Sequence, residues 1–279
     1  MSLKKLPKIN AKAPTGVKWD TPSDAMSKWD ASLVSASSDN ATITMYDAIG
    51  SDGWTEGVTA KRVSAALRSI GAKDVTVSLN SPGGDFFEGI AIYNLLREHP
   101  HKVTVKVVGL AASAASIIAM AGDEIQVAKT GFLMIHNAWV FAIGNRHDLR
   151  ASADILDEFD GVMAGLYADA AGITAKEAAK MMDDETWMSG QAAVDAGFAT
   201  SLLDADEVAI DAGSGENANA AIRRVEAIMA QQGLPRSERK DLLNKIKGMP
   251  GAALPAMPGA GLLEEIASLT TLYRSIRHE

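Results

Sequence analysis

The stretch VTVSLNSPGGDFFEGIAIYNLLREHPHKVTVKVVGLAASAAS, residues 75–116, decides the fold. β-Branched and apolar residues dominate 75–80 and 102–109, which predicts two strands. Between them, 86–99 has the apolar spacing of a helix, and the small residues of 114–122 predict a second helix. This order of strand, helix, strand, helix is typical of βαβ units with parallel strands.

The flanking segments extend the same pattern. Residues 41–47 predict a strand, and 58–72 predict an amphipathic helix that Thr59 opens and Gly71 closes. Two short strands and then three helices are expected further along, over 124–128, 132–137, 146–171, 174–182 and 189–197. The fold class is therefore α/β.

Composition predicts three parts along the chain. Residues 1–40 are polar and contain prolines, which indicates an N-terminal arm. Residues 41–206 hold the α/β pattern and form the expected domain. From 207 to 279 the composition shifts to Ala, Gly, Pro and basic residues, which indicates a helical C-terminal extension. Its expected helices cover 217–231, 236–247 and 262–277.

Bulk composition excludes several classes of function. A formal net charge of −8 argues against a protein that binds nucleic acid phosphates. The chain has no cysteine, so it has neither disulfides nor a thiolate nucleophile. Because no window has the length and apolarity of a membrane span or a signal peptide, we expect a cytoplasmic protein without membrane contact.

Ser113 is the candidate nucleophile. It lies at a strand-to-helix junction, in Gly109-Leu110-Ala111-Ala112-Ser113-Ala114-Ala115. The positive end of the helix dipole favours an attacking oxygen there. The alternative is that these small residues only pack a buried helix against the sheet. Ser116, one turn further on, is a weaker candidate.

Three other segments could carry chemistry at strand ends. Residues 80–84, Asn-Ser-Pro-Gly-Gly, can present bare amides to an oxyanion, or can be a plain turn. His136 ends an apolar strand and can serve as a base, or can be structural. The acidic cluster 183–185 can orient a histidine, or can be a charged turn between helices.

Together these segments resemble the ClpP family of serine peptidases, across roughly residues 41–206. The matching residues are Ser81-Pro82-Gly83-Gly84, Gly109-Leu110-Ala111-Ala112-Ser113, Met134-Ile135-His136, and the Trp187-Met188-Ser189, Ala193 and Gly197-Phe198 series. The resemblance implies a crotonase-like α/β spiral of βαβ units. It also implies a handle built from a helix and a strand over about 139–171.

The resemblance implies a Ser-His-acid triad and no cofactor or metal. Ser113 would be the nucleophile and His136 the base, with Glu185 as the acid and Asp184 as the alternative, since the family's usual acid is Asp. The amides of Gly84 and Ala114 would form the oxyanion hole. The peptide substrate would lie along four residues, near the segment after Gly84 and the strand at 139–143: Gly83, Asp85, Asn137 and Trp139.

The resemblance also implies assembly into a homo-oligomeric ring, which can be stacked. The N-terminal segment does not resemble the family's pore-lining loop, so a partnership with an AAA+ unfoldase stays open. With the added extension 207–279, the chain resembles phage and prophage head maturation proteases, which are variants of this domain with added tails. This implies a capsid or scaffold substrate in the host cytoplasm or procapsid. The main alternative is an inactive ClpP-like ring that acts as an assembly component. An acyl-CoA hydratase or isomerase and a serine-lysine peptidase share the core, but neither explains both Ser113 and His136.

Overall fold

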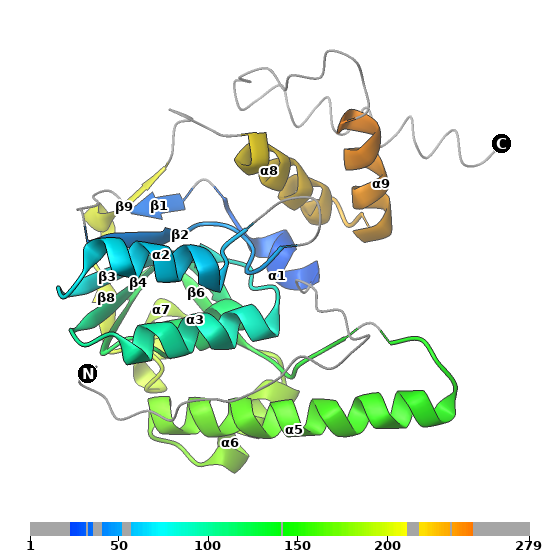
Figure 1. Cartoon of the computed structure of the whole chain (residues 1–279), viewed down its shortest axis with the longest axis horizontal. Coiled ribbons are helices and arrows are strands. Elements are labelled where there is room, and N and C mark those ends of the chain that lie inside the picture. Colours follow the sequence, from blue (N-terminus) through cyan, green and yellow to red (C-terminus); the bar gives the residue numbers. More distant parts are fainter. Residues whose placement is uncertain are drawn as a thin grey trace.

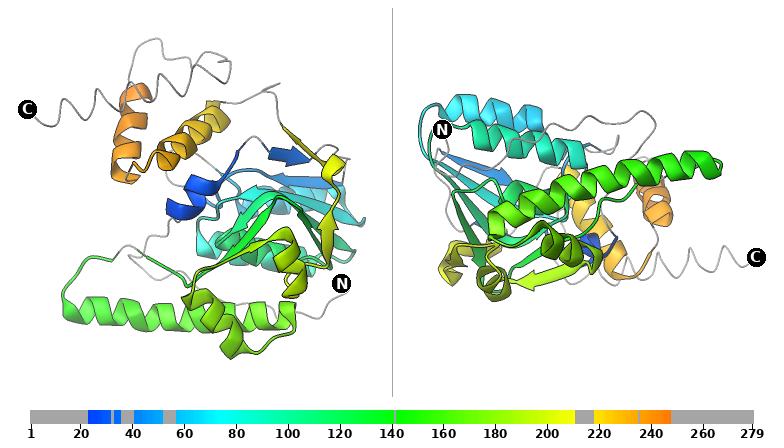
Figure 2. Two further views of the ribbon diagram at one scale, coloured as in Figure 1. Left: turned by 180° about the vertical axis from the view of Figure 1, so that it is seen from behind. Right: turned by 90° about the horizontal axis from the view of Figure 1, so that it is seen from below.

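A computed structural model of the chain describes residues 23–31, 33–35, 41–51, 57–140, 142–210, 218–234 and 236–247. Figure 1 shows a twisted sheet with helices α2 and α3 side by side against it, and the long helix α5 running beneath the body. The views in Figure 2 show that helices α8 and α9 lie at the opposite end of the molecule from α5.

The central sheet has seven strands. Five of them follow the order β2-β3-β4-β5-β8, and every neighbouring pair among these is parallel. Their bounds are β2 Thr42–Met45, β3 Val75–Ser81, β4 Val103–Ala112, β5 Glu124–Ala128 and β8 Ser201–Leu203.

Strand β4 changes its neighbour along its length. Its first half pairs with β5 over Thr104–Val107, and its last residues, Leu110–Ala112, pair in parallel with β6, Phe132–Ile135. Strand β7, Thr186–Ser189, lies antiparallel on the other side of β6. This divergence of β6 from β5 gives the sheet its spiral form and brings the carboxyl ends of β4 and β6 together.

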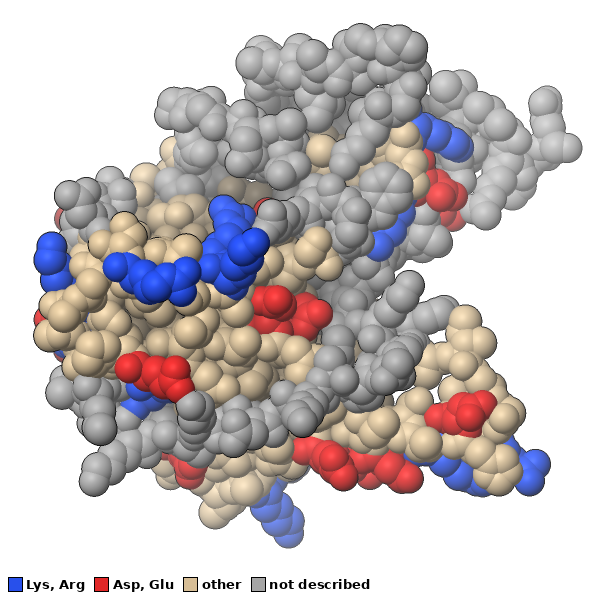
Figure 3. Space-filling view, in the orientation of Figure 1, with Lys and Arg blue, Asp and Glu red and all other residues tan. Residues whose placement is uncertain are grey.

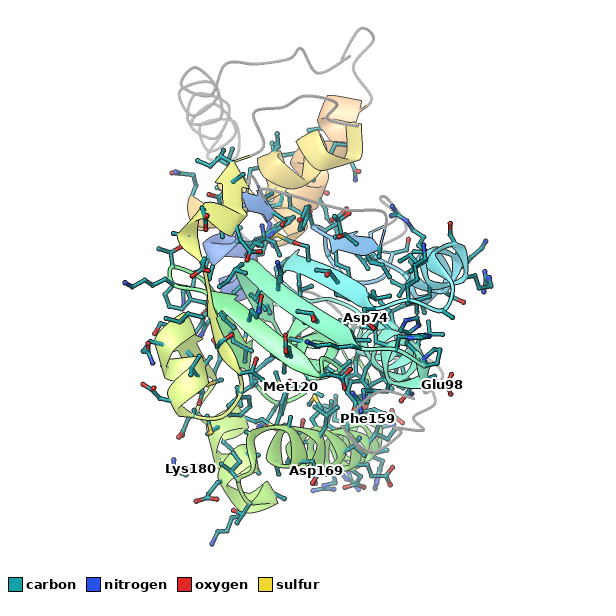
Figure 4. All side chains as sticks on the ribbon, turned by 90° about the vertical axis from the view of Figure 1, so that its left-hand side faces the viewer. Asp74, Glu98, Met120, Phe159, Asp169 and Lys180 are labelled. Carbon is teal, nitrogen blue, oxygen red and sulfur yellow. The ribbon has the colours of Figure 1, made fainter. Side chains whose placement is uncertain are left out.

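The sheet is buried because its strands are apolar on both faces, as expected for parallel strands covered by helices. Val77, Val105 and Leu133, on three different strands, are completely buried. Figure 4 shows Met120 and Phe159 between the sheet and α5, and both belong to the main core.

Polar side chains cap the starts of α2, α3, α5, α6 and α7, and Thr59 opens α2 as the sequence predicts. The Thr59 side chain accepts from the amide of Arg62 at the start of α2, and Thr174 with Glu177 forms a capping box at α6. The bounds are α2 Ala60–Ile70, α3 Phe86–Glu98, α4 Ala114–Ala119, α5 Arg146–Ala171, α6 Ala175–Asp183 and α7 Gly190–Asp195.

These elements confirm the predicted α/β fold, with two differences. The handle strand expected near 139–143 is not formed by residues 139, 140, 142 and 143. A strand requires a hydrogen-bonded neighbour, and none pairs with this stretch in the described part of the chain. Strands β7 and β8 were not expected, because each is too short to show an alternating pattern.

Parts of the two predicted flanking segments pack against each other. Helix α1, Ser23–Lys28, lies beside α8, Ala218–Gln231, and strand β1, Leu33–Ser35, pairs with β9, Val208–Ile210. The short 3-10 helix η1, Ala205–Glu207, precedes β9, and helix α9 covers Arg236–Lys247. The division of the chain into three parts, at residues 40 and 206, stays a prediction. The helix expected over 262–277 lies outside the described residues.

Figure 3 shows the charged side chains on one face of the molecule. Lysine and arginine gather over α2, whereas α5 carries aspartate and glutamate along its length and arginine at its projecting end. Among the helices that the structure describes, none combines the length and apolar character needed to cross a membrane.

Asn80, at the end of β3, ties this strand to its surroundings and gives the first prediction. Its side chain accepts from the Leu110 amide at 3.0 Å and donates to the Asp30 carbonyl at 2.7 Å. Asn80→Ala leaves a buried amide without its acceptor, so we expect the free energy of unfolding in urea to fall by about 1–3 kcal/mol. The exposed Asn244→Ala on α9 should change it by less than about 0.5 kcal/mol. Equal stability of the two variants would contradict this role of Asn80.

Candidate active site

Ser113 occupies a sharp turn between β4 and α4. Its φ of 55° and ψ of −126° lie where non-glycine residues are rare. The turn is held from both sides, since the Ser113 amide donates to the Met134 carbonyl at 3.0 Å and its carbonyl accepts from Ser116 Oγ at 2.6 Å. Backbone strain of this kind is maintained at functional sites, where it presents a side chain that a regular helix would bury.

His136 directly follows β6 and faces Ser113. Its Nε2 lies 2.8 Å from Ser113 Oγ. Burial lowers the pKa of His136 below its ordinary value, and the charge of Glu185 opposes that effect. The imidazole is therefore neutral near pH 7 and able to accept a proton from the serine hydroxyl.

The three acidic residues before β7 have different partners. Asp183 Oδ1 accepts from Asn137 Nδ2 at 2.8 Å, and Asp184 Oδ2 accepts from Lys180 Nζ at 2.6 Å. Glu185, with φ 46°, acts on His136 through its charge. The pKa of His136 is thus affected by the charge of Glu185 rather than that of Asp184, which favours Glu185 as the candidate acid.

A pocket of about 320 Å³, including its open mouth, adjoins Ser113 and His136. Apolar side chains form most of its wall. Its lining consists of Gly84, Phe86, Ser113, Ala114, Ile117, His136, Asn137, Ala138, Trp139, Met163 and Tyr167. The structure therefore brings Gly84, Ala114, Asn137 and Trp139 together, as expected for residues of one site.

Gly83 and Asp85 do not line this pocket. The Asp85 carboxylate caps α3, where Oδ1 accepts from the amides of Phe87 at 2.8 Å and Glu88 at 3.1 Å. Gly83, with φ 90°, supports the serine turn instead, because a Cβ there would lie 2.7 Å from Ser113 Cβ. Gly83 therefore supports the serine turn, and Asp85 supports the start of α3.

The backbone amide of Gly84 points away from the neighbouring segment, which contains Ile49. The amide of Ile49 donates to Gly83 O at 2.8 Å, and the amide of Asp85 donates to Ile49 O at 2.9 Å, so this backbone ladder passes over Gly84. A Cβ on Gly84 would lie 2.1 Å from Ile49 O, which excludes any other residue without a shift of the backbone.

Helix α5 contributes residues that sequence reasoning missed. Tyr167 OH lies 2.8 Å from Ser116 Oγ, Met163 lines the pocket, and Asp160 Oδ1 accepts from the Ala138 amide at 2.7 Å. Burial raises the pKa of Asp160. The spacing 160, 163, 167 is that of one helix face, so the helical pattern could have placed them together.

No group of three or more side chains suited to holding a metal is present within the described ranges. The chemistry that the site can perform is that of a hydroxyl and an imidazole beside backbone amides.

The two candidate acids can be separated by NMR titration of His136. Because the Glu185 charge raises the pKa of His136 against the effect of burial, Glu185→Gln should lower it further. Asp184→Asn should leave it close to the wild-type value, since Asp184 is paired with Lys180. A larger change in Asp184→Asn than in Glu185→Gln would exchange the roles of the two acids.

Comparison with known proteins identifies the family of the chain. The family model described as Clp protease matches residues 29–206. The ATP-dependent Clp protease proteolytic subunit 1 of Leifsonia xyli subsp. xyli is 26% identical over 145 residues, which cover 50% of this chain and 74% of the relative. A Bacteroides fragilis subunit is 27% identical over 133 residues, 47% of this chain and 64% of its own length. The solved structure of a ClpP1 point mutant from Listeria monocytogenes, 24% identical, matches the fold with a TM-score of 0.51 over 60% of this chain and 92% of its own. Since the family model covers more than half of it, the chain belongs to the Clp protease family of serine peptidases.

Proposed function

We propose that this protein is a serine endopeptidase in which Ser113 is the nucleophile and His136 the general base. The observation that carries the proposal is the 2.8 Å contact between Ser113 Oγ and His136 Nε2 beside a pocket. A nucleophile within hydrogen-bond reach of a neutral base is the arrangement that acyl transfer requires.

In the proposed reaction, His136 takes the proton of Ser113 as Oγ attacks the peptide carbonyl. The C–N bond then breaks, and His136 returns the proton to the leaving amine. A water molecule releases the acyl group by the same steps in reverse. Glu185 stabilises the imidazolium that forms in each half of the reaction.

The amides of Gly84 and Ala114 form the proposed oxyanion hole. Ala114 is the first residue of α4, where amides have no partner inside the helix. The backbone ladder beside Gly84 uses the carbonyl of Gly83 and the amide of Asp85, and passes over the amide of Gly84. Both residues line the pocket with Ser113. Loss of one such donor costs on the order of 10²–10³ in rate.

The peptide is proposed to lie along Asn137 and Trp139, with an apolar side chain in the pocket. Phe86, Ile117 and Met163 form that part of the wall. The hydrogen bonds from Asn137 to Asp183 and from Ala138 to Asp160 fix the start of this segment. A fixed segment reduces the entropy that is lost when a peptide binds.

We further propose a homo-oligomeric ring, in line with the assembly expected of the family. Large apolar side chains are exposed on α5 and just before it: Ile143 is 84% and Leu149 47% exposed. Figure 1 shows that the amino-terminal half of α5 extends beyond the body. Exposed apolar groups on a projecting helix are suited to contact with a second copy.

The proposed substrate is a capsid or scaffold protein, as in a phage or prophage head maturation protease. This part rests on an analogy, since the extension 207–279 is an addition to the domain and such enzymes also carry added tails. The relatives are named as subunits of ATP-dependent proteases, but an AAA+ unfoldase is no part of the proposal. The competing function is a ring that assembles without catalysis.

Labelling with a fluorophosphonate probe tests the nucleophile and the base. The wild type should be labelled at Ser113, Ser113→Ala should not react, and His136→Ala should react at least about 100-fold more slowly because the base is gone. Ser69→Ala, at an exposed serine of α2 that does not line the pocket, is the control and should still be labelled at Ser113. An assembled wild-type protein that takes no label would favour the non-catalytic ring.

Light scattering after size-exclusion chromatography tests the assembly. The wild type should form an oligomer. The double variant Ile143→Glu, Leu149→Glu should form an assembly of lower molar mass, because it places charges on the proposed contact. The control is Ile210→Glu on β9, a residue that is 71% exposed and lies away from α5. A monomeric wild type, or an unchanged double variant, would contradict this part of the proposal.

A further inference from the structure

Glu185 is held by a tryptophan two residues further along the chain. The indole Nε1 of Trp187 donates a hydrogen bond to Glu185 Oε1 at 3.1 Å. Glu185 ends the turn before β7, and Trp187 lies within that strand, opposite Met134 of β6. The left-handed backbone of Glu185, with φ 46°, accompanies a turn across which the indole bonds to the carboxylate with one residue between them.

The Trp187 ring is fixed in turn by the N-terminal helix. Lys28 Nζ, from the last turn of α1, lies 3.7 Å from the centre of the ring. This is the geometry of a cation–π interaction. The ring that Lys28 contacts is the one whose N–H donates to the Glu185 carboxylate. The cation–π contact therefore helps to fix the donor of this hydrogen bond.

A small apolar cluster supports the ring from behind. Trp187 packs against a cluster whose buried members come from α1, α8, β4 and β6 and from the segment after α1: Ala25, Met26, Trp29, Leu110, Ala112, Met134, Ala227 and Ala230. Two of these precede the candidate catalytic residues in the chain, since Ala112 adjoins Ser113 and Met134 lies two residues before His136. The same apolar cluster therefore packs against Trp187 and contains residues that lie next to Ser113 and close to His136 in the chain.

Glu185 needs such support because its side chain is exposed. A glutamate has three rotatable bonds, so holding it in one rotamer costs side-chain entropy. An unrestrained carboxylate in water would also be screened from His136. A donor fixed in the strand next to it reduces both losses.

We propose that Trp187 is a positioning residue for the reaction, which holds the Glu185 carboxylate beside His136, and that Lys28 holds the Trp187 ring. The proposal rests on the function proposed above, in which Glu185 is the acid. It assigns to α1, and to the helix α8 that packs on it, a supporting role at the active site. The two flanking segments of the chain would thereby influence catalysis without touching the substrate.

The variant Trp187→Phe tests this role, because it keeps an aromatic ring over which Lys28 can lie and removes only the N–H donor. With a peptide substrate, kcat should fall roughly tenfold with little change in KM, well below the ~10⁴-fold loss that follows removal of an orienting acid. Lys28→Met, which keeps most of the apolar stem, should act in the same direction and more weakly.

The pH dependence separates positioning from general damage. Burial lowers the pKa of His136 and the Glu185 charge raises it. When Glu185 is released in Trp187→Phe, the pKa of His136 should fall, so the acidic limb of kcat/KM should move to lower pH. Trp29→Phe is the matched control: it also loses an indole N–H bond, 3.2 Å to Asn80 O, in the same cluster. It should lower stability without moving this limb.

NMR titration of His136 keeps the test independent of activity. If the wild type shows no hydrolysis that depends on Ser113, the proposed function fails, but the imidazole pKa can still be compared between variants. A lower pKa in Trp187→Phe, and not in Trp29→Phe, supports the positioning role. A pKa equal to that of the wild type in Trp187→Phe would overturn it.

Discussion

The carboxyl end of β4 must leave β5, join β6 and turn into α4 within a few residues, and the rest of the site depends on how this turn is held. Ser113 adopts a positive φ there because the Met134 carbonyl binds its amide and the Gly83 backbone presses against it without a side chain. The same pairing of β4 with β6 sets where β6 ends, and therefore where His136 lies. One change of strand partner thus places the hydroxyl and the imidazole within hydrogen-bond distance.

Two opposing influences then set the protonation of His136. Its burial favours the neutral ring, whereas the Glu185 carboxylate favours the charged one. A base must be neutral before the reaction and stable as a cation during it, so both influences are needed. Because Glu185 is exposed, solvent weakens the effect of its charge on the pKa of His136. In the proposed role of Trp187, the hydrogen bond from its indole holds the carboxylate in one orientation.

Much of this could be predicted from the sequence where the pattern is local. The strand and helix periods of 75–116 give β3, α3, β4 and α4, and the glycines and small residues mark the turns that carry Gly84 and Ser113. Distant pairings could not be predicted: neither the contact of α1 with α8 nor that of Asp160 with Ala138 leaves a periodic signal. Asp85 shows the limit clearly, because an acid beside a glycine-rich turn suits both a binding residue and a helix cap, and its hydrogen bonds show the cap.

The central claim, that Ser113 forms a covalent intermediate with His136 as base, is tested most directly by trapping that intermediate. An activated ester of a short apolar peptide is mixed with the assembled protein, the reaction is quenched in acid within its first turnover, and the intact mass and a peptide map are recorded. The account predicts one acyl group per chain, on Ser113, that forms much more slowly in His136→Ala. Ester turnover without an acyl group on Ser113, or an acyl group that forms equally fast without His136, would contradict it.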